Sequence, residues 1–167
     1  GDVAADPKGG AVVTMDSLTA PADLYHVDFK GQTTRLTSVN ADKLADIDTP
    51  RAIKFSFKGA NGDTVWGYQV DNIGMVAAKS VPVAFLVHGG PQSTFGDGWS
   101  YRWNPAVFAG AGYSAILIDF HGSVGHGQAF TDSINQDWGG KPFEDLKLGF
   151  AAAEKQFPWI NADNACA

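Results

Sequence analysis

The chain has little of several features that mark particular classes of protein. Its single cysteine, Cys166, excludes an intrachain disulfide and a thiolate metal cluster. No apolar run reaches the roughly 18 residues that a membrane-spanning helix needs. Lys and Arg are scattered singly and the formal net charge is -6, so there is no basic stripe to neutralise phosphates. We therefore expect neither a nucleic-acid partner nor a membrane partner.

A targeting segment is also missing from the first residues. Residues 1–6 have no basic stretch followed by an apolar one, as a signal peptide would. A cytosolic protein, a trimmed precursor and an internal fragment all fit this start, and we favour the fragment. The composition, with 44% hydrophobic and 18% charged residues, is that of a globular protein with enough apolar side chains for a core.

The first part of the chain is patterned differently from the rest. Residues 11–15, 23–29 and 33–37 are short β-rich runs separated by turn-forming residues, and they predict an antiparallel meander. A lone meander is only marginally stable in water, so we expect this one to belong to a larger sheet or repeat.

From residue 50 onward the pattern predicts a layered α/β sheet. Runs 52–58 and 64–71 alternate around a glycine-rich turn and predict a β-hairpin. The apolar runs 81–87 and 114–120 predict parallel strands that are covered on both faces. Strands that alternate with helices imply right-handed βαβ crossovers.

Two helices and a final strand complete this prediction. Asn104 and Pro105 predict a helix start, and a second helix is predicted after residues 140–142 and before Pro158. The chain between 120 and 140 is interpreted as a loop, and 161–163 as a turn. A strand is expected to begin at Asn164.

The most informative site lies where the apolar run 81–87 ends, at His88, Gly89 and Gly90. A glycine has no Cβ, so its backbone N–H can closely approach the negative oxygen that forms during acyl transfer. This predicts half of an oxyanion hole. A simple tight turn between a strand and a helix is the alternative, and these residues alone leave both open.

Three other side chains are of types that bind metal ions. His121 and His126, with Asp119, could be imagined to hold zinc, but their spacing matches no common site and we interpret the segment as a structural loop. We therefore predict no metal and no cofactor.

Four further residues are expected to be structural. We expect three tryptophans to pack in the core and the lone thiol to be buried. These residues are Trp99, Trp138, Trp159 and Cys166.

Three motifs follow one another in a specific order. They are HGGP at 88–91, DFHGSVGHG at 119–127 and DWGGKPFEDL at 137–146. With them the chain resembles the prolyl oligopeptidase family of serine peptidases, most closely its acylaminoacyl-peptidase and dipeptidyl peptidase V branch. The resemblance is dense over 50–167 and weak over 1–49.

The resemblance implies the fold and the domains. Residues 50–167 would form the N-terminal half of an α/β-hydrolase sheet, the first half of the peptidase domain. Residues 1–49 would be a remnant of a β-propeller, the end of its last blade. In the family a Gly-x-Ser-x-Gly nucleophile elbow follows the strand that here begins at Asn164, so we expect a fragment that ends just before the elbow.

The catalytic triad has no counterpart in these residues. None of the nine serines lies in a Gly-x-Ser-x-Gly frame, and all four histidines precede the expected nucleophile, whereas this fold places the triad histidine last. Carried over by position, the Gly90 backbone N–H would be an oxyanion donor, and His88 and Gly89 would contact substrate.

The implied activity is serine-type hydrolysis of short peptides near their N-terminus, with this chain inactive alone. Two alternatives stay open: an esterase or lipase-type α/β-hydrolase, and a non-catalytic fragment that pairs with a complementary chain. The expected partners are a peptide substrate and either a second copy or the missing remainder of the enzyme. The resemblance suggests a periplasmic or secreted location, with any export signal upstream of Gly1.

Overall fold

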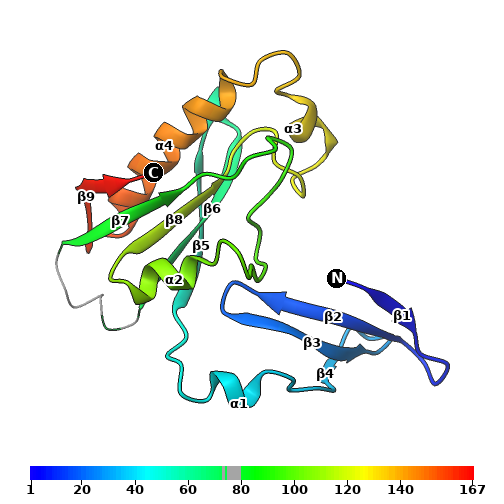
Figure 1. Cartoon of the computed structure of the whole chain (residues 1–167). Helices are drawn as coiled ribbons and strands as arrows, with labels where there is room; N and C mark the ends of the chain where they lie inside the picture. The colour runs from blue at the N-terminus through cyan, green and yellow to red at the C-terminus, as the bar shows by residue number, and fades with distance from the viewer. Residues whose placement is uncertain (73, 75–79) are drawn as a thin grey trace. The chain divides into compact units, whose positions relative to one another are not determined.

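The computed structural model describes residues 1–72, 74 and 80–167, and it is an α/β structure with two sheets (Figure 1). The chain divides into two compact units. The first unit comprises Gly1–Thr49 and Asp97–Asn104, and the second comprises Pro50–Gly96 and Pro105–Ala167. Within the described residues, no helix combines the length and the apolarity needed to cross a bilayer.

The first unit is built on a four-stranded antiparallel sheet in which the strands follow chain order. Its strands are β1 (Val3–Ala5), β2 (Ala11–Ser17), β3 (Ala20–Val27) and β4 (Thr33–Arg35). The predicted meander is confirmed as β2, β3 and β4. The sequence analysis missed β1 and the short helix α1 (Ala41–Leu44), each of which has no buried residue.

A segment distant in sequence belongs to this unit through two carboxylates. Asp97 Oδ1 accepts a hydrogen bond from the backbone N–H of Leu18 at 2.8 Å. In return, the backbone N–H of Trp99 donates to Asp16 Oδ2 at 2.7 Å. Because each partner supplies one carboxylate, Asp97–Asn104 is bonded to the turn that joins β2 and β3 and to the strand before it.

The second unit holds a five-stranded sheet in the order β5-β6-β8-β7-β9. Its strands are β5 (Arg51–Lys58), β6 (Thr64–Asp71), β7 (Val81–Leu86), β8 (Ser114–Asp119) and β9 (Ile160–Cys166). The pairs β5–β6 and β6–β8 are antiparallel, while β7 is parallel to both β8 and β9. The predicted hairpin and both predicted buried strands are confirmed.

Helices and apolar side chains cover this sheet. The helices are α2 (Pro105–Gly110), α3 (Gln128–Asp132) and α4 (Lys141–Gln156). Every residue of β8 is buried, so both faces of this central strand are covered. On one face Ile116 and Ile118 belong to a core cluster with Ala153 of α4, which lies along the sheet (Figure 1). Burial on both faces explains why β8 is continuously apolar in sequence.

Two local expectations were wrong. The short helix α3 lies inside the stretch that was expected to be a loop. Strand β9 begins at Ile160, and residues 161–163 belong to it. They form an irregularity, because Asn161 pairs with Pro82 whereas the next strand position, Val83, pairs with Ala165. Residues 161–163 have the composition of a turn, but their pairing with β7 places them in a strand.

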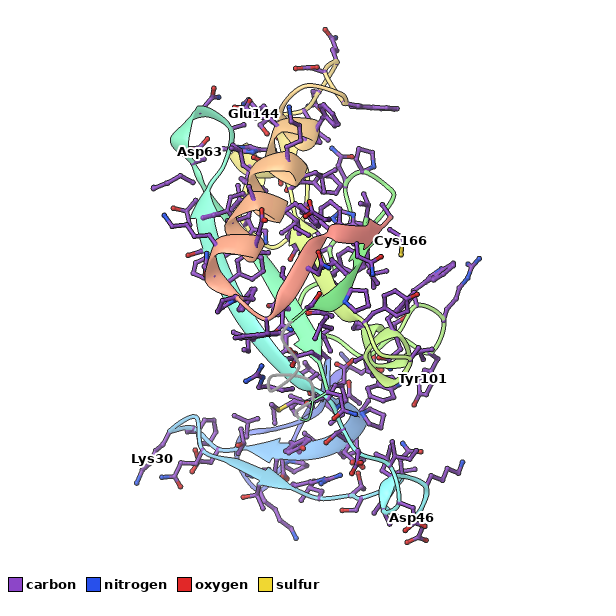
Figure 2. All side chains as sticks on the ribbon, turned by 90° about the vertical axis from the view of Figure 1, so that its left-hand side faces the viewer. Lys30, Asp46, Asp63, Tyr101, Glu144 and Cys166 are labelled. Carbon is purple, nitrogen blue, oxygen red and sulfur yellow. The ribbon has the colours of Figure 1, made fainter. Side chains whose placement is uncertain are left out.

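Two expectations about burial were also wrong. Trp138 is 70% exposed, because it lies in the connection before α4, and Cys166 is exposed near the end of the edge strand β9 (Figure 2). Trp159 does pack against the core cluster, and its indole N–H donates to Asp71 Oδ2 at 2.8 Å. The indole Nε1 of Trp99 is buried.

Candidate active site

The predicted oxyanion turn lies at the carboxyl end of β7, which has a parallel neighbour on each side. Open α/β sheets bind ligands beyond the carboxyl ends of their strands. Gly90 has a φ of +132°, and a Cβ there would lie 3.1 Å from the backbone nitrogen of Gln92. Both the backbone conformation and the close approach therefore require glycine at this position.

The amides of this turn are free of the sheet ladder. The pairing of β7 with β8 ends at Leu86, before the two glycines. Gly89 and Gly90 are exposed, and neither of their N–H groups donates to a protein acceptor in the described part of the chain. An exposed, unpaired backbone N–H can donate to a ligand without first breaking a protein hydrogen bond.

The side chain of His88 is buried beneath this turn, with 7% of its surface exposed. Its ring stacks on Phe120, with ring centroids 4.3 Å apart. Nε2 lies 2.9 Å from the Ser123 hydroxyl, and Nδ1 lies 3.1 Å from the carbonyl oxygen of Gly89. The imidazole is therefore engaged with protein groups on both of its nitrogens, and the exposed part of this motif is the backbone of Gly89 and Gly90.

The carboxylate of Asp119, at the end of β8, holds the far end of the same loop. It is 2% exposed. Oδ1 accepts from the backbone N–H of Phe95 at 2.8 Å, and Oδ2 accepts from that of Gly96 at 3.4 Å. His126 Nε2 lies 3.5 Å from Oδ2, and His88 Nε2 lies 3.9 Å from Oδ1. The loop that follows β7 is thus bonded to the end of β8.

A second buried carboxylate, Asp145, organises the chain just after β8. Its Oδ2 accepts from the backbone N–H of His121 at 2.7 Å and contacts His121 Nδ1 at 2.6 Å, while its Oδ1 accepts from the Ala60 N–H at 2.8 Å. His121 Nε2 lies 3.2 Å from Asp63 Oδ2, and the ring stacks on Phe130. Asp145 thereby ties α4 to the β5–β6 connection and to the end of β8.

The side chains considered as zinc ligands contact other protein groups. Both ring nitrogens of His121 face carboxylates, and Asp119 accepts backbone amides. No group of three or more His, Cys, Asp or Glu side chains in the described ranges is placed to hold a metal ion.

Sequence reasoning missed the contact between Ser123 and His88 and the contacts between Asp119 and the loop after β7. A signal was available, because the carboxyl ends of adjacent parallel strands meet at one edge of a sheet. Asp119 ends β8, which is the neighbour of β7. The direction of each side chain, however, depends on the turn that follows each strand.

Comparison with known proteins gives matches for both the sequence and the fold. Residues 99–167 match the model of the prolyl oligopeptidase family, a stretch that includes the motifs at 119–127 and 137–146. Over 111 residues the chain is 43% identical to dipeptidyl-peptidase 5 of Schizosaccharomyces pombe, covering 66% of this chain and 16% of the relative. Over 90 residues it is 46% identical to dipeptidyl-peptidase 5 of Aspergillus oryzae, covering 54% and 12%. The chain thus spans less than a fifth of the length of either relative.

Solved structures share the fold. Acylaminoacyl peptidase of Pyrococcus horikoshii superimposes with a TM-score of 0.81 at 24% identity, covering 96% of this chain and 25% of that one. Dipeptidyl peptidase 4 of Porphyromonas gingivalis gives a TM-score of 0.70 at 18% identity, covering 93% and 22%. Together with the sequence matches, these similarities confirm the resemblance to the prolyl oligopeptidase family that the three motifs indicated.

Proposed function

We propose that these residues are part of a serine-type peptidase that hydrolyses short peptides near their N-terminus, as a dipeptidyl- or acylaminoacyl-peptidase. The observation that carries the proposal is the Gly90 N–H, which is exposed at the carboxyl end of β7 and has no acceptor in the described residues. The names of the matched relatives, dipeptidyl-peptidase 5 and acylaminoacyl peptidase, support the substrate class. An acylaminoacyl peptidase of the same fold is known in complex with a peptide chloromethyl ketone.

The proposal includes the domain organisation. Residues 50–167 would be the first half of an α/β-hydrolase domain. The order β5-β6-β8-β7-β9 supports this, because the third and fourth strands in chain order exchange places and so create parallel neighbours around β7. Residues 1–49 would be the end of a β-propeller. A four-stranded antiparallel sheet of short strands has the size of one propeller blade.

The chemistry assigned to the turn is stabilisation of charge. In acyl transfer a serine oxygen attacks the substrate carbonyl carbon, a histidine takes the hydroxyl proton, and the carbonyl oxygen becomes negative. The Gly90 N–H would donate to that oxygen. Losing one such donor in subtilisin lowers kcat by about 10²- to 10³-fold, which sets the expected scale. The triad would lie in polypeptide that these 167 residues do not include, because they contain no Gly-x-Ser-x-Gly frame.

Two measurements test this proposal. The 167-residue chain should not hydrolyse dipeptidyl chromogenic substrates and should not react with a fluorophosphonate that labels activated serines. A longer polypeptide that carries the same sequence and continues through a nucleophile elbow should do both. Covalent labelling of a serine in the 167-residue chain, or no labelling of the longer polypeptide, would refute it.

A second role, pairing with a complementary chain, is supported by strand β9. This strand lies at the edge of the sheet, where its last four residues, 163–166, are exposed. An open edge next to exposed side chains favours pairing with another strand. We expect the purified chain to self-associate or to bind the remainder of the enzyme, and light scattering that shows a stable, folded monomer would contradict this.

The remaining alternative is an ester substrate, since the same turn serves esterases and lipases. Comparing aryl-ester with dipeptidyl substrates on the longer polypeptide distinguishes the two. A faster turnover of simple esters at every substrate concentration would favour the esterase.

A further inference from the structure

The orientation of the Gly89–Gly90 peptide is held from one side by His88. The carbonyl oxygen of Gly89 lies 3.1 Å from His88 Nδ1. A carbonyl oxygen can only accept a hydrogen bond, so the proton of this contact is on Nδ1. The two partners are adjacent in sequence, and the bond therefore fixes a single peptide plane rather than joining distant parts of the chain.

That contact also sets the direction of the neighbouring N–H group. The Gly89 carbonyl and the Gly90 N–H belong to the same trans peptide, and the cis bond is the next one, Gly90–Pro91. In a planar trans peptide the C=O and the N–H point in opposite directions. While His88 binds the Gly89 oxygen, the Gly90 N–H must therefore point away from the imidazole. A flipped peptide would instead turn the carbonyl outward and bring an acceptor to the place where a donor is needed.

Ser123 contacts the other ring nitrogen of His88. Its side chain is fully buried, and its hydroxyl lies 2.9 Å from His88 Nε2. In a neutral imidazole with the proton on Nδ1, Nε2 is an acceptor, and the Ser123 hydroxyl supplies the matching donor. The stack of His88 on Phe120 holds the plane of the ring in which both contacts are made.

The rest of the loop is anchored to the same segment. The Ser93 carbonyl accepts from the Val124 N–H at 2.9 Å, and Asp119 accepts from the amides of Phe95 and Gly96. The loop is therefore bonded at its start, middle and end to residues 119–124. These anchors restrict where the loop lies, whereas the contacts of His88 restrict which way one peptide faces.

We propose that Ser123 and His88 are positioning residues for the oxyanion site: Ser123 donates to Nε2 and holds the ring of His88 in place, and His88 fixes the Gly89–Gly90 peptide with its N–H directed outward. This inference rests on the proposed function only where it takes the Gly90 N–H to be the donor to the substrate oxygen. Neither side chain touches substrate, since both are buried and their polar atoms face protein groups.

The experiment is NMR on the 167-residue chain, labelled with ¹⁵N and ¹³C. We expect the nitrogen resonances of His88 to report a proton on Nδ1 and none on Nε2. We also expect a coupling through the hydrogen bond between His88 Nδ1 and the Gly89 carbonyl carbon. The variant Ser123→Ala should lose this coupling and shift the Gly90 amide resonance.

Two further variants separate positioning from general stability. His88→Phe keeps a ring to stack on Phe120 but removes both nitrogens, and it should shift the Gly90 amide as Ser123→Ala does. Ser133→Ala is the matched control, because that half-buried hydroxyl donates to the Phe130 carbonyl within its own turn. It should leave His88 and Gly90 unchanged.

The outcomes are distinct. A proton on Nε2 alone, or a Gly90 amide that does not change in Ser123→Ala and His88→Phe, overturns the inference. The readout needs no turnover, so it fails separately from the proposed function. An active longer polypeptide together with an unaffected Gly90 peptide would refute only the positioning role, and an inert longer polypeptide together with an intact coupling would refute only the peptidase.

Discussion

Three buried carboxylates, Asp23 in the first unit and Asp119 and Asp145 in the second, are held in different ways, whereas Asp71 of the second unit pairs with Arg51 much as Asp23 pairs with Arg35. In the first unit Asp23, which is 4% exposed, faces the guanidinium of Arg35 and accepts from the Thr37 hydroxyl at 2.7 Å and the Val39 N–H at 3.0 Å. In the second unit Asp119 and Asp145 accept backbone amides and contact imidazoles, and no Lys or Arg in the described residues forms an ion pair with them.

The partners of each carboxylate show which part of the fold it holds together. The partners of Asp23 all lie in β4 or shortly after it, so this carboxylate fastens one edge of a sheet. Asp119 instead accepts amides from the loop after β7, and Asp145 accepts amides from the β5–β6 connection and from the residue next to Phe120 after β8. These two carboxylates therefore define the shape of the loops around the end of β8. A backbone amide has a fixed direction, so Asp119 and Asp145, which each accept two amides, specify loop geometry more tightly than Asp23, which accepts one amide and pairs with a flexible arginine.

The largest loss of stability among these carboxylates is expected when Asp145 is removed. Asp145→Ala leaves two backbone amides and a buried imidazole without their acceptor, and each buried donor left without a partner costs about 1–3 kcal/mol. We expect a loss of about 3 kcal/mol or more in the free energy of unfolding of the second unit. Urea denaturation followed through amide signals of β8 measures it.

The control is the neighbouring residue of α4. Glu144 is exposed in the first turn of the helix, so Glu144→Ala removes only a favourable interaction with the helix dipole, worth about 0.3–1 kcal/mol (Figure 2). Equal midpoints for the two variants would show that Asp145 does not organise the unit.

A smaller and more local effect is expected at Asp119. Asp119→Asn replaces one carboxylate oxygen by an N–H₂ group that cannot accept, so one loop amide loses its partner at a cost of about 1–3 kcal/mol. Hydrogen exchange at Phe95 and Gly96 should accelerate, while exchange in β2 and β3 stays unchanged. The exposed Asp132, whose carboxylate accepts from the Gln128 side chain, provides the control Asp132→Asn. Unchanged exchange at both loop amides would contradict the anchoring role.

The third effect depends on pH and belongs to the first unit. The backbone N–H of Val39, followed by the Thr37 hydroxyl and the Arg35 guanidinium, lowers the pKa of Asp23 from 3.8 to about 2. Because the pKa is lower in the folded state, the unfolded state binds the proton more readily. The stabilisation is therefore complete above pH 3.8 and is lost as the pH falls toward about 2.

Acid titration of the first unit checks this expectation. Signals of β3 and β4 should weaken toward unfolding between about pH 4 and pH 2. Asp23→Asn should be less stable at neutral pH and should lose that part of the pH dependence. A variant that keeps the full acid transition would show that other carboxylates cause it.

The smallest change in stability is expected at a residue that contacts none of the carboxylates Asp23, Asp119 and Asp145. Trp138 is 70% exposed, so Trp138→Ser should change the free energy of unfolding by less than about 0.5 kcal/mol. Trp159→Ala is the matched comparison, because Trp159 packs on the core cluster and its loss should cost about 3–5 kcal/mol. Similar unfolding curves for the two variants would contradict the assigned burial.

Local sequence pattern was sufficient for the regular elements. The hairpin of β5 and β6, the strands β7 and β8 and the helix α4 were predicted from alternation, continuous apolar runs and helical spacing. Prediction failed where the partner lay far away. The irregular pairing of Asn161 in β9 and the exposure of Trp138 and Cys166 depend on which surfaces other elements cover, and no short window of sequence contains that information.

The candidate site divides in the same way. The sequence by itself determined that a glycine turn follows a buried strand, because Gly89 and Gly90 are the residues that allow close backbone approach and, at Gly90, a positive φ. Only the tertiary structure decided that the turn is held by His88, Ser123 and Asp119, since those contacts exist because β7 and β8 are parallel neighbours. Parallel pairing brings the ends of both strands to one edge, and the direction in which the Gly90 N–H points is a consequence of that packing.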